Sequence, residues 1–166
     1  MASDEYGDCE GWDYTLDQNA FMNQYFVPYI KLSQVSMKNI YGYTDLQGKY
    51  HSVDKDVFVL IDGTIIYFFR NQYMQNKNFI LVDLNGPSKP NRLGRDVFAF
   101  SFYENILTAY TQYTQINITN FRKPGNGGTS GQCNRSAQGG VFGPGSYCST
   151  VIMGNNWSIP VGYPWN

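Results

Sequence analysis

Charged side chains are scarce in this 166-residue chain, making up 15% of it, against about 25% in an average soluble domain. The formal net charge of −1 excludes a strongly basic protein that binds nucleic acid through its bulk charge. No apolar run reaches the roughly 18 residues that a membrane helix needs, and no signal peptide follows Met1. We therefore expect a soluble domain with no nucleic-acid partner.

The residue types that most often carry catalysis are also few. The chain has one histidine, His51, and three cysteines without C-x-x-C spacing, a pattern that does not indicate a zinc site. It contains neither a G-x-S-x-G nucleophile motif nor a phosphate-binding G-x-x-x-x-G-K-[ST] loop. We expect His51 to be a surface histidine and the protein not to be an enzyme.

Aromatic residues are abundant instead. They account for 17% of the chain, and apolar residues together for 42%, which is enough for one domain with a sizeable core. Six of the 13 acidic residues precede residue 18, where the chain has no Lys or Arg. We assign residues 1–16 to an acidic tail, whose first three residues could remain from cloning, and residues 17–166 to a globular domain.

The start of this domain has the pattern of a helix. Asp17 is a suitable N-cap for a helix that begins near Gln18. Apolar side chains then recur at helical spacing over residues 21–32, and Pro28 must kink or divide the helix. We expect about two turns on each side of the proline and an aromatic face that packs on a sheet, formed by Phe21, Tyr25 and Tyr29.

The middle of the chain has the character of strands. Two runs of β-branched and aromatic residues flank Asp62-Gly63, which is typical of a hairpin with a type I′ turn. Strands are predicted at residues 57–61, 64–69, 79–83, 97–102 and 107–116. The predicted fold class is α+β: an N-terminal helix packed on an antiparallel sheet of three to five strands, followed by a disulfide-bounded C-terminal loop region.

Glycine and proline crowd residues 124–145, which cannot form a regular element cheaply. Cys133 and Cys148 lie within and just after this segment. A disulfide between them would close a loop of about 15 residues, contribute roughly 3 kcal/mol, and imply an oxidising compartment outside the cytoplasm. Cys9 would then stay unpaired. The alternative is three reduced thiols.

The loop between the third and fourth predicted strands is rich in oxygen donors. A hard cation such as Ca²⁺ could be surrounded by backbone carbonyls and by the side chains of Asp83, Asn85, Asn91 and Asp96. Positive charge lies in the same loop, on Lys89, Arg92 and Arg95. The alternative is therefore a loop that satisfies itself, with Asx-turns and a contact between Asp96 and an arginine.

Three segments follow one another in a pattern shared with a known group of proteins. The first segment, residues 26–31, has the sequence FVPYIK and is similar to a "YxxPYLK" step. The second, residues 79–100, is similar to "D-x-N-G…P-N…G-x-D-x-F". The third, residues 148–165, is similar to "C-A-A-x-I-x-x-x-G-W-x-I…Y-P-W". Together these segments resemble bacterial type IV pilins and type II secretion pseudopilins. The resemblance extends over about residues 20–165.

This resemblance implies a structural subunit that acts by assembly into a filament and by surface display. Its partners would be other pilin or pseudopilin subunits, and a hydrophobic N-terminal helix would anchor it in the inner membrane before assembly, outside the cytoplasm. That helix and its cleavage site do not occur in the sequence, so we expect either a soluble piece of such a subunit, which we favour, or a relative that does not polymerise. Lys89 also replaces an expected glycine.

A second function, from another class, remains open. The chain could be a secreted binding module, adhesin-like or lectin-like, that uses its Tyr/Trp-rich surface and its Gly-rich loop. An ordinary signal peptide upstream would favour this module. A basic leader followed by about 20 apolar residues with an early Glu would favour the pilin.

Overall fold

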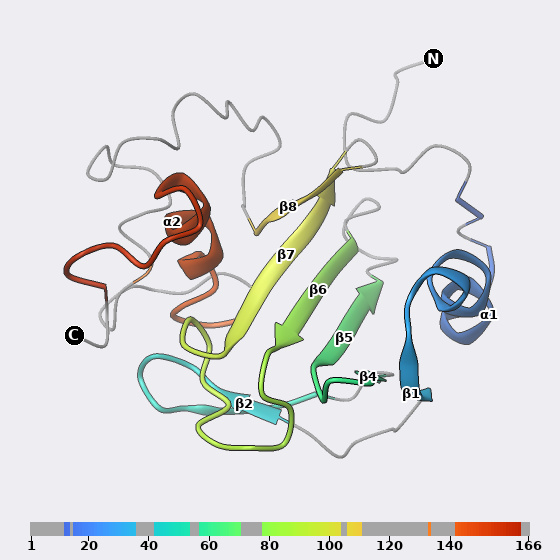
Figure 1. Cartoon of the computed structure of the whole chain (residues 1–166), viewed down its shortest axis with the longest axis horizontal. Coiled ribbons are helices and arrows are strands. Elements are labelled where there is room, and N and C mark those ends of the chain that lie inside the picture. Colours follow the sequence, from blue (N-terminus) through green and yellow to red (C-terminus); the bar gives the residue numbers. More distant parts are fainter. Residues whose placement is uncertain are drawn as a thin grey trace.

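The computed structural model shows a mostly β protein (Figure 1). It describes residues 12–13, 15–35, 42–53, 57–70, 78–103, 106–110, 133 and 142–163. Six strands form an antiparallel sheet in the order β1-β4-β5-β6-β7-β8, and β2 pairs with β3 in a separate two-stranded ribbon. Every pair of neighbouring strands in the large sheet is antiparallel.

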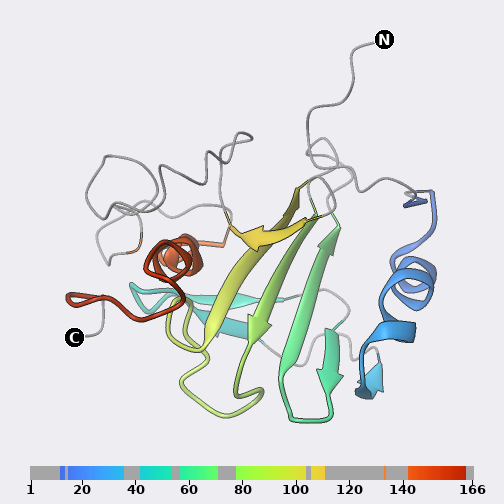
Figure 2. The same cartoon turned by 45° about the horizontal axis from the view of Figure 1, so that its top comes forward.

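The elements follow in chain order. They are α1 (Gln18–Tyr25), the 3-10 turn η1 (Val27–Tyr29), β1 (Leu32–Val35), β2 (Gly42–Thr44), β3 (Tyr50–Ser52), β4 (Val57–Leu60), β5 (Ile65–Arg70), β6 (Asn78–Asp83), β7 (Val97–Tyr103), β8 (Ile106–Ala109) and α2 (Cys148–Gly154). In both views α1 lies at the β1 end of the sheet, and α2 lies beside β7 and β8 (Figures 1 and 2).

The predicted fold class, an N-terminal helix packed on a sheet of three to five strands, is wrong. The large sheet has six strands and a second sheet has two. The two α-helices of the described residues are short, with eight residues in α1 and seven in α2. They do not form a helical layer, so the protein is mainly a sheet structure.

Pro28 explains the largest difference at the N-terminal end. The helix begins at Gln18 as predicted, and the Asp17 carboxylate accepts a hydrogen bond from the Ala20 N–H at 2.9 Å. Proline has no N–H and disfavours helical geometry in the residue before it. The chain therefore makes one 3-10 turn and enters β1 instead of a second helical segment, and Tyr29, at 82% exposed, does not pack on the sheet.

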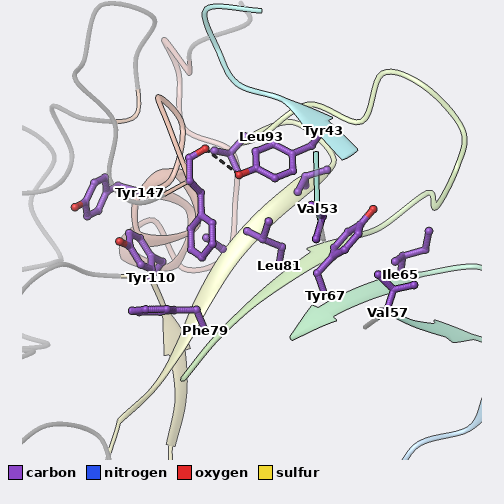
Figure 3. Packing of buried hydrophobic residues seen from close by; sticks show 13 residues of the cluster. Tyr43, Val53, Val57, Ile65, Tyr67, Phe79, Leu81, Leu93, Tyr110 and Tyr147 are labelled. Atoms are coloured by element: carbon purple, nitrogen blue, oxygen red, sulfur yellow. Dashed lines mark hydrogen bonds between the residues drawn. The ribbon is translucent and has the colours of Figure 1, made fainter. Parts of the chain in front are cut away.

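The main core covers one face of the sheet (Figure 3). Tyr67, Leu81 and Ala99 are direct cross-strand neighbours and are fully buried in it. The β2–β3 ribbon adds Tyr43, whose hydroxyl donates to the carbonyl of Phe142 at 3.0 Å. The ribbon and the segment before α2 therefore close this core together.

The opposite face carries a second cluster, which we call the α1-side cluster. Phe21 and Met22 of α1 pack there with three residues of the sheet, Phe58, Phe68 and Ile80. Trp12 and Leu16, from the predicted acidic tail, also pack against it. One turn of α1 thus contacts the sheet, although the helix is too short to cover it.

The β4–β5 turn also departs from its prediction. A type I′ turn needs a positive φ at both central residues, but only Gly63 has one, +90°. Leu60 and Thr64 instead flank a three-residue loop: the Leu60 N–H donates to the Thr64 carbonyl at 2.8 Å, and Asp62 accepts from the Thr64 N–H at 2.9 Å. The short Asp62 side chain stabilises this longer turn.

Candidate functional site in the β6–β7 loop

A buried carboxylate stands at the end of β6. Strand alternation directs Phe79, Leu81 and Asp83 to the same face, so Asp83 follows two core residues and is itself 0% exposed. Ile65 and Val97 are its cross-strand neighbours and are also buried. A carboxylate in such surroundings is costly unless it is paired.

Asp96 organises the loop that follows. Its carboxylate accepts hydrogen bonds from the backbone N–H of Asn91 at 2.9 Å and of Arg92 at 2.5 Å. Its own carbonyl accepts from the Leu84 N–H at 2.9 Å, which closes the loop at its base. Asn91 has φ +43°, a left-handed conformation that Asn tolerates better than most residues. Asp83, Asn91 and Asp96 are thereby held in one loop.

Two oxygen atoms in this loop have no hydrogen-bond partner in the described part of the chain. One is Oδ2 of Asp83, whose other oxygen accepts from the Asn85 N–H at 3.3 Å. The second is Oδ1 of Asn91, which is equally buried. Most buried side-chain oxygens have a partner, so these two mark the loop as a candidate ligand site.

The electrostatics of Asp83 reflect this arrangement. Burial raises the pKa of Asp83 to about 7. The backbone N–H groups of Asn85 and Gly86 oppose this change, and the nearby Asp96 carboxylate adds to it. Two carboxylates therefore share the loop, and none of the described Lys or Arg residues forms an ion pair with either of them.

The structure separates the four predicted ligands. Asp83, Asn91 and Asp96 belong to one hydrogen-bonded loop, whereas Asn85 is exposed and contributes its backbone N–H to Asp83. No group of three or more His, Cys, Asp or Glu that could hold a metal occurs in the described residues. A site here would thus combine two carboxylates with an amide oxygen, and calcium binding stays a prediction.

The basic residues of the loop are directed elsewhere. Lys89 and Arg95 are exposed. The Arg92 guanidinium donates to the carbonyls of Asp45 and Leu46, both at 3.3 Å. The contact between Asp96 and an arginine is therefore made by the backbone N–H of Arg92 and not by its side chain. Among the described residues, no Lys or Arg forms an ion pair with Asp83 or Asp96.

The far side of the loop packs against the C-terminal segment. Cys133 and Cys148 form the predicted disulfide, and Cys9 lies outside the described residues. Gly94 has φ +81°, and a Cβ there would lie 2.7 Å from the Cys148 sulfur. The Tyr163 hydroxyl donates to the Gly94 carbonyl at 2.9 Å. Only glycine fits position 94, because both its backbone conformation and the sulfur exclude a side chain.

A second polar pair, formed by Asp45 and His51, was not predicted from the sequence. Nε2 of His51 lies 2.9 Å from Oδ2 of Asp45, and the imidazole stacks on the Tyr43 ring with centroids 5.2 Å apart. Asp45 is 1% exposed and also accepts from the backbone N–H of Gln47 and Lys49. His51 was expected at the surface, but it is partly buried in the ribbon; only the β2–β3 pairing brings the two residues together.

This pair gives an expected dependence of stability on pH. Burial acts to raise the pKa of Asp45, but hydrogen bonds from His51, Lys49 and Gln47 outweigh it and lower the pKa below the ordinary value. The ionised carboxylate therefore adds stability above its unfolded pKa, and this stability is lost as the pH falls through the lower folded pKa. We expect Asp45→Asn to cost about 1.5–3 kcal/mol at pH 7, since a hydrogen bond to a charged group is lost, and less at pH 3.

Urea unfolding at both pH values measures this difference. Asp17→Asn, which keeps a helix-capping side chain, is the matched control and should cost little at either pH. An Asp45→Asn penalty that is equal at pH 7 and pH 3 would contradict the role given to the ionised carboxylate.

Comparison with known proteins gives a family but no function. A family model described as "Family of unknown function (DUF6613)" matches residues 1–166. No curated protein and no solved structure matches the chain.

Proposed function

We propose that this chain, which belongs to the DUF6613 family of unknown function, is a non-enzymatic structural subunit of a pilin-like filament. It would act by assembly and surface display, as a pilin or pseudopilin, with other subunits as its partners. The support comes from the three segments that resemble those proteins and from how the fold uses them.

The observation that carries the proposal is the contact between two of these segments. Residues 79–100 and 148–165 meet at Gly94, whose carbonyl accepts from Tyr163 and whose Cα lies against Cys148. The motif glycine, the motif cysteine and the motif tyrosine thus take part in one packing unit. Such a unit gives a physical reason for the three residues to occur together.

The remaining segment, residues 26–31, forms the step from helix to sheet. Val27–Tyr29 make the 3-10 turn between α1 and β1, and Tyr29, its last residue, is largely exposed. An exposed aromatic residue at such a step is suited to contact with a neighbouring subunit.

An extracytoplasmic location is part of the same proposal. The Cys133–Cys148 disulfide fits an oxidising compartment. In the described residues no helix is long and apolar enough to cross a membrane. The inner-membrane anchor and the filament core would come from a hydrophobic helix that precedes this domain.

The test is to map the native polypeptide in its host cells. Sheared surface filaments, envelope and soluble fractions are separated, and the mature N-terminus of the protein is determined by mass spectrometry. We expect a mature form that carries about 20 apolar residues ahead of this domain and that fractionates with filaments or envelope. Secretion of a free domain after removal of an ordinary signal peptide would contradict the filament role and support the secreted binding module.

A further inference from the structure

We propose that the loop after α2, residues 155–163, inserts apolar side chains into the surface of a lipid bilayer. We call it the 155–163 loop. Three side chains make the contact: Trp157, Ile159 and Val161. The inference goes beyond the filament role and does not rest on it, because it concerns a surface that the domain carries whatever precedes it in the chain.

The first observation is the exposure of these three side chains. Trp157 is 62% exposed, Ile159 is 57% exposed, and Val161 is fully exposed. They occur at every second position, and the loop extends away from the sheet in both views (Figures 1 and 2). Single hydrophobic residues on a surface are ordinary, but several large ones on one projecting segment mark a contact with a protein or a membrane.

The second observation is the backbone that presents Trp157. Asn156 and Trp157 both have a positive φ, +54° and +60°. Asn tolerates this left-handed conformation, whereas a bulky side chain adopts it rarely and at a cost in free energy. The Trp157 N–H donates to the Ile152 carbonyl at 2.9 Å, so the last turn of α2 holds the residue in place. Strained positions of this kind cluster at functional sites; this one fixes a large ring in an exposed position.

The 155–163 loop also pairs several of its own backbone groups. The Ser158 N–H donates to the Asn155 carbonyl at 3.1 Å, and the Asn155 side-chain amide donates back to the Ser158 carbonyl at 3.0 Å. The Tyr163 N–H donates to the Pro160 carbonyl at 3.2 Å, and proline has no N–H to satisfy. Internal pairing suits a loop that enters lipid, where no water is available to backbone groups. A sugar-binding loop would instead turn such groups toward its ligand.

The composition of this part of the chain selects the partner. Residues 136–166 contain no Asp, Glu, Lys, Arg or His. A charged side chain is costly to bring into a bilayer, and this segment has none to bring. Trp is enriched at membrane–water interfaces because its ring is apolar and its N–H is polar. The aliphatic Ile159 and Val161 add apolar surface that a glycan has no means to cover.

Tyr163 anchors the far end of the loop. It is buried in a cluster with Leu46 and Cys148, and its hydroxyl donates to the Gly94 carbonyl at 2.9 Å. The 155–163 loop is therefore held at α2 and at Tyr163. Because these contacts order the loop before it meets a surface, the contact loses less conformational entropy.

Flotation of the whole chain with phosphatidylcholine vesicles, with the disulfide intact, tests the contact. We expect the chain to float with these uncharged vesicles and part of its tryptophan fluorescence to be quenched by lipids with brominated acyl chains. Trp157→Phe keeps an apolar ring, so it should still float but should lose the quenched component. The difference between the two chains separates Trp157 from Trp12 and Trp165.

Two double variants make the test specific. Ile159→Ser/Val161→Ser should weaken partition into the vesicles about tenfold or more, because it removes two apolar side chains that the bilayer covers. The matched control is Ile61→Ser/Leu84→Ser, which removes two comparably exposed aliphatic side chains outside the loop and should leave partition unchanged. All four positions are exposed, so the thermal midpoint of both variants should stay near that of the wild type.

Two results would overturn the proposal. One is the absence of both flotation and quenching by brominated lipid. If Ile159→Ser/Val161→Ser then abolishes a self-association seen in sedimentation, or the binding of a neutral oligosaccharide, the partner is a second copy or a glycan. The other is equal weakening by Ile61→Ser/Leu84→Ser, which would mean adsorption of the whole surface. Neither result bears on the filament proposal, since that proposal is tested on the native N-terminus.

Discussion

Phe68→Ala should lower the free energy of unfolding by about 3–5 kcal/mol, because it removes a fully buried ring from the centre of the α1-side cluster. Phe68 lies in β5 and is 0% exposed. Its ring centroid is 5.6 Å from that of Phe21 and 5.2 Å from that of Phe26. The cavity would open between the helical turn and the sheet, where neither side can close it without moving a backbone element.

Phe100→Ala is the matched control. Phe100 lies in the same cross-strand row as Phe68, with Ile80 between them, but it is only partly buried. We expect it to cost about half as much, or less, since solvent already reaches the ring. Urea unfolding of the two variants gives the comparison. A near-native midpoint for Phe68→Ala would mean that the α1-side cluster does not stabilise the fold, and equal penalties would mean that the burial of the ring does not set the cost.

The strands that sequence analysis identified are those whose own side chains specify them. β4 to β7 are rich in β-branched and aromatic residues, and this composition fits a pleated surface buried on both faces. The side chains of β7 alternate between the two faces of the sheet. Val97 and Ala99 enter the main core, whereas Phe98 and Phe100 are half-buried on the α1 side.

Elements specified by distant contacts were not predicted. β2 and β3 have three residues each, too few for a pattern. The ribbon is attached by bonds from remote positions: the Thr44 N–H donates to the Asn91 carbonyl, and the Leu46 N–H to the Pro144 carbonyl. β1 was hidden because residues 21–32 also fit a helical period, and only the effect of Pro28 on the backbone decides against the helix.

The sequence located the loop that holds the candidate site, but it did not show which of its side chains are buried. Four oxygen-bearing side chains between two strands indicated the loop. Sequence gives neither the burial of Asp83 nor the exposure of Asn85, because both depend on where β6 ends. From the sequence, the positive charge of Arg92 could also neutralise the loop carboxylates. Its guanidinium instead donates to carbonyls of the residues that follow β2, and the β2–β3 ribbon was not predicted.

Reduction of the Cys133–Cys148 disulfide should lower the free energy of unfolding by about 3 kcal/mol. The bond joins residues 15 apart, and closing a loop of that size restricts the unfolded chain by roughly this amount in the chain-entropy description. Cys148 is also fully buried at the start of α2, and its sulfur packs against Gly94. Loss of the bond therefore loosens the contact between the C-terminal segment and the β6–β7 loop.

Guanidinium unfolding with and without a reductant measures the effect. The Cys133→Ala/Cys148→Ala variant should unfold near the midpoint of the reduced wild type and should not respond to the reductant, because its remaining cysteine, Cys9, has no partner within the chain. Peptide mapping without reduction should recover the 133–148 pair. Two results would contradict this prediction. Recovery of a Cys9–Cys148 peptide would mean that the native disulfide is a different one, and a wild-type midpoint unchanged by reduction would mean that the Cys133–Cys148 bond does not stabilise the contact between α2 and Gly94.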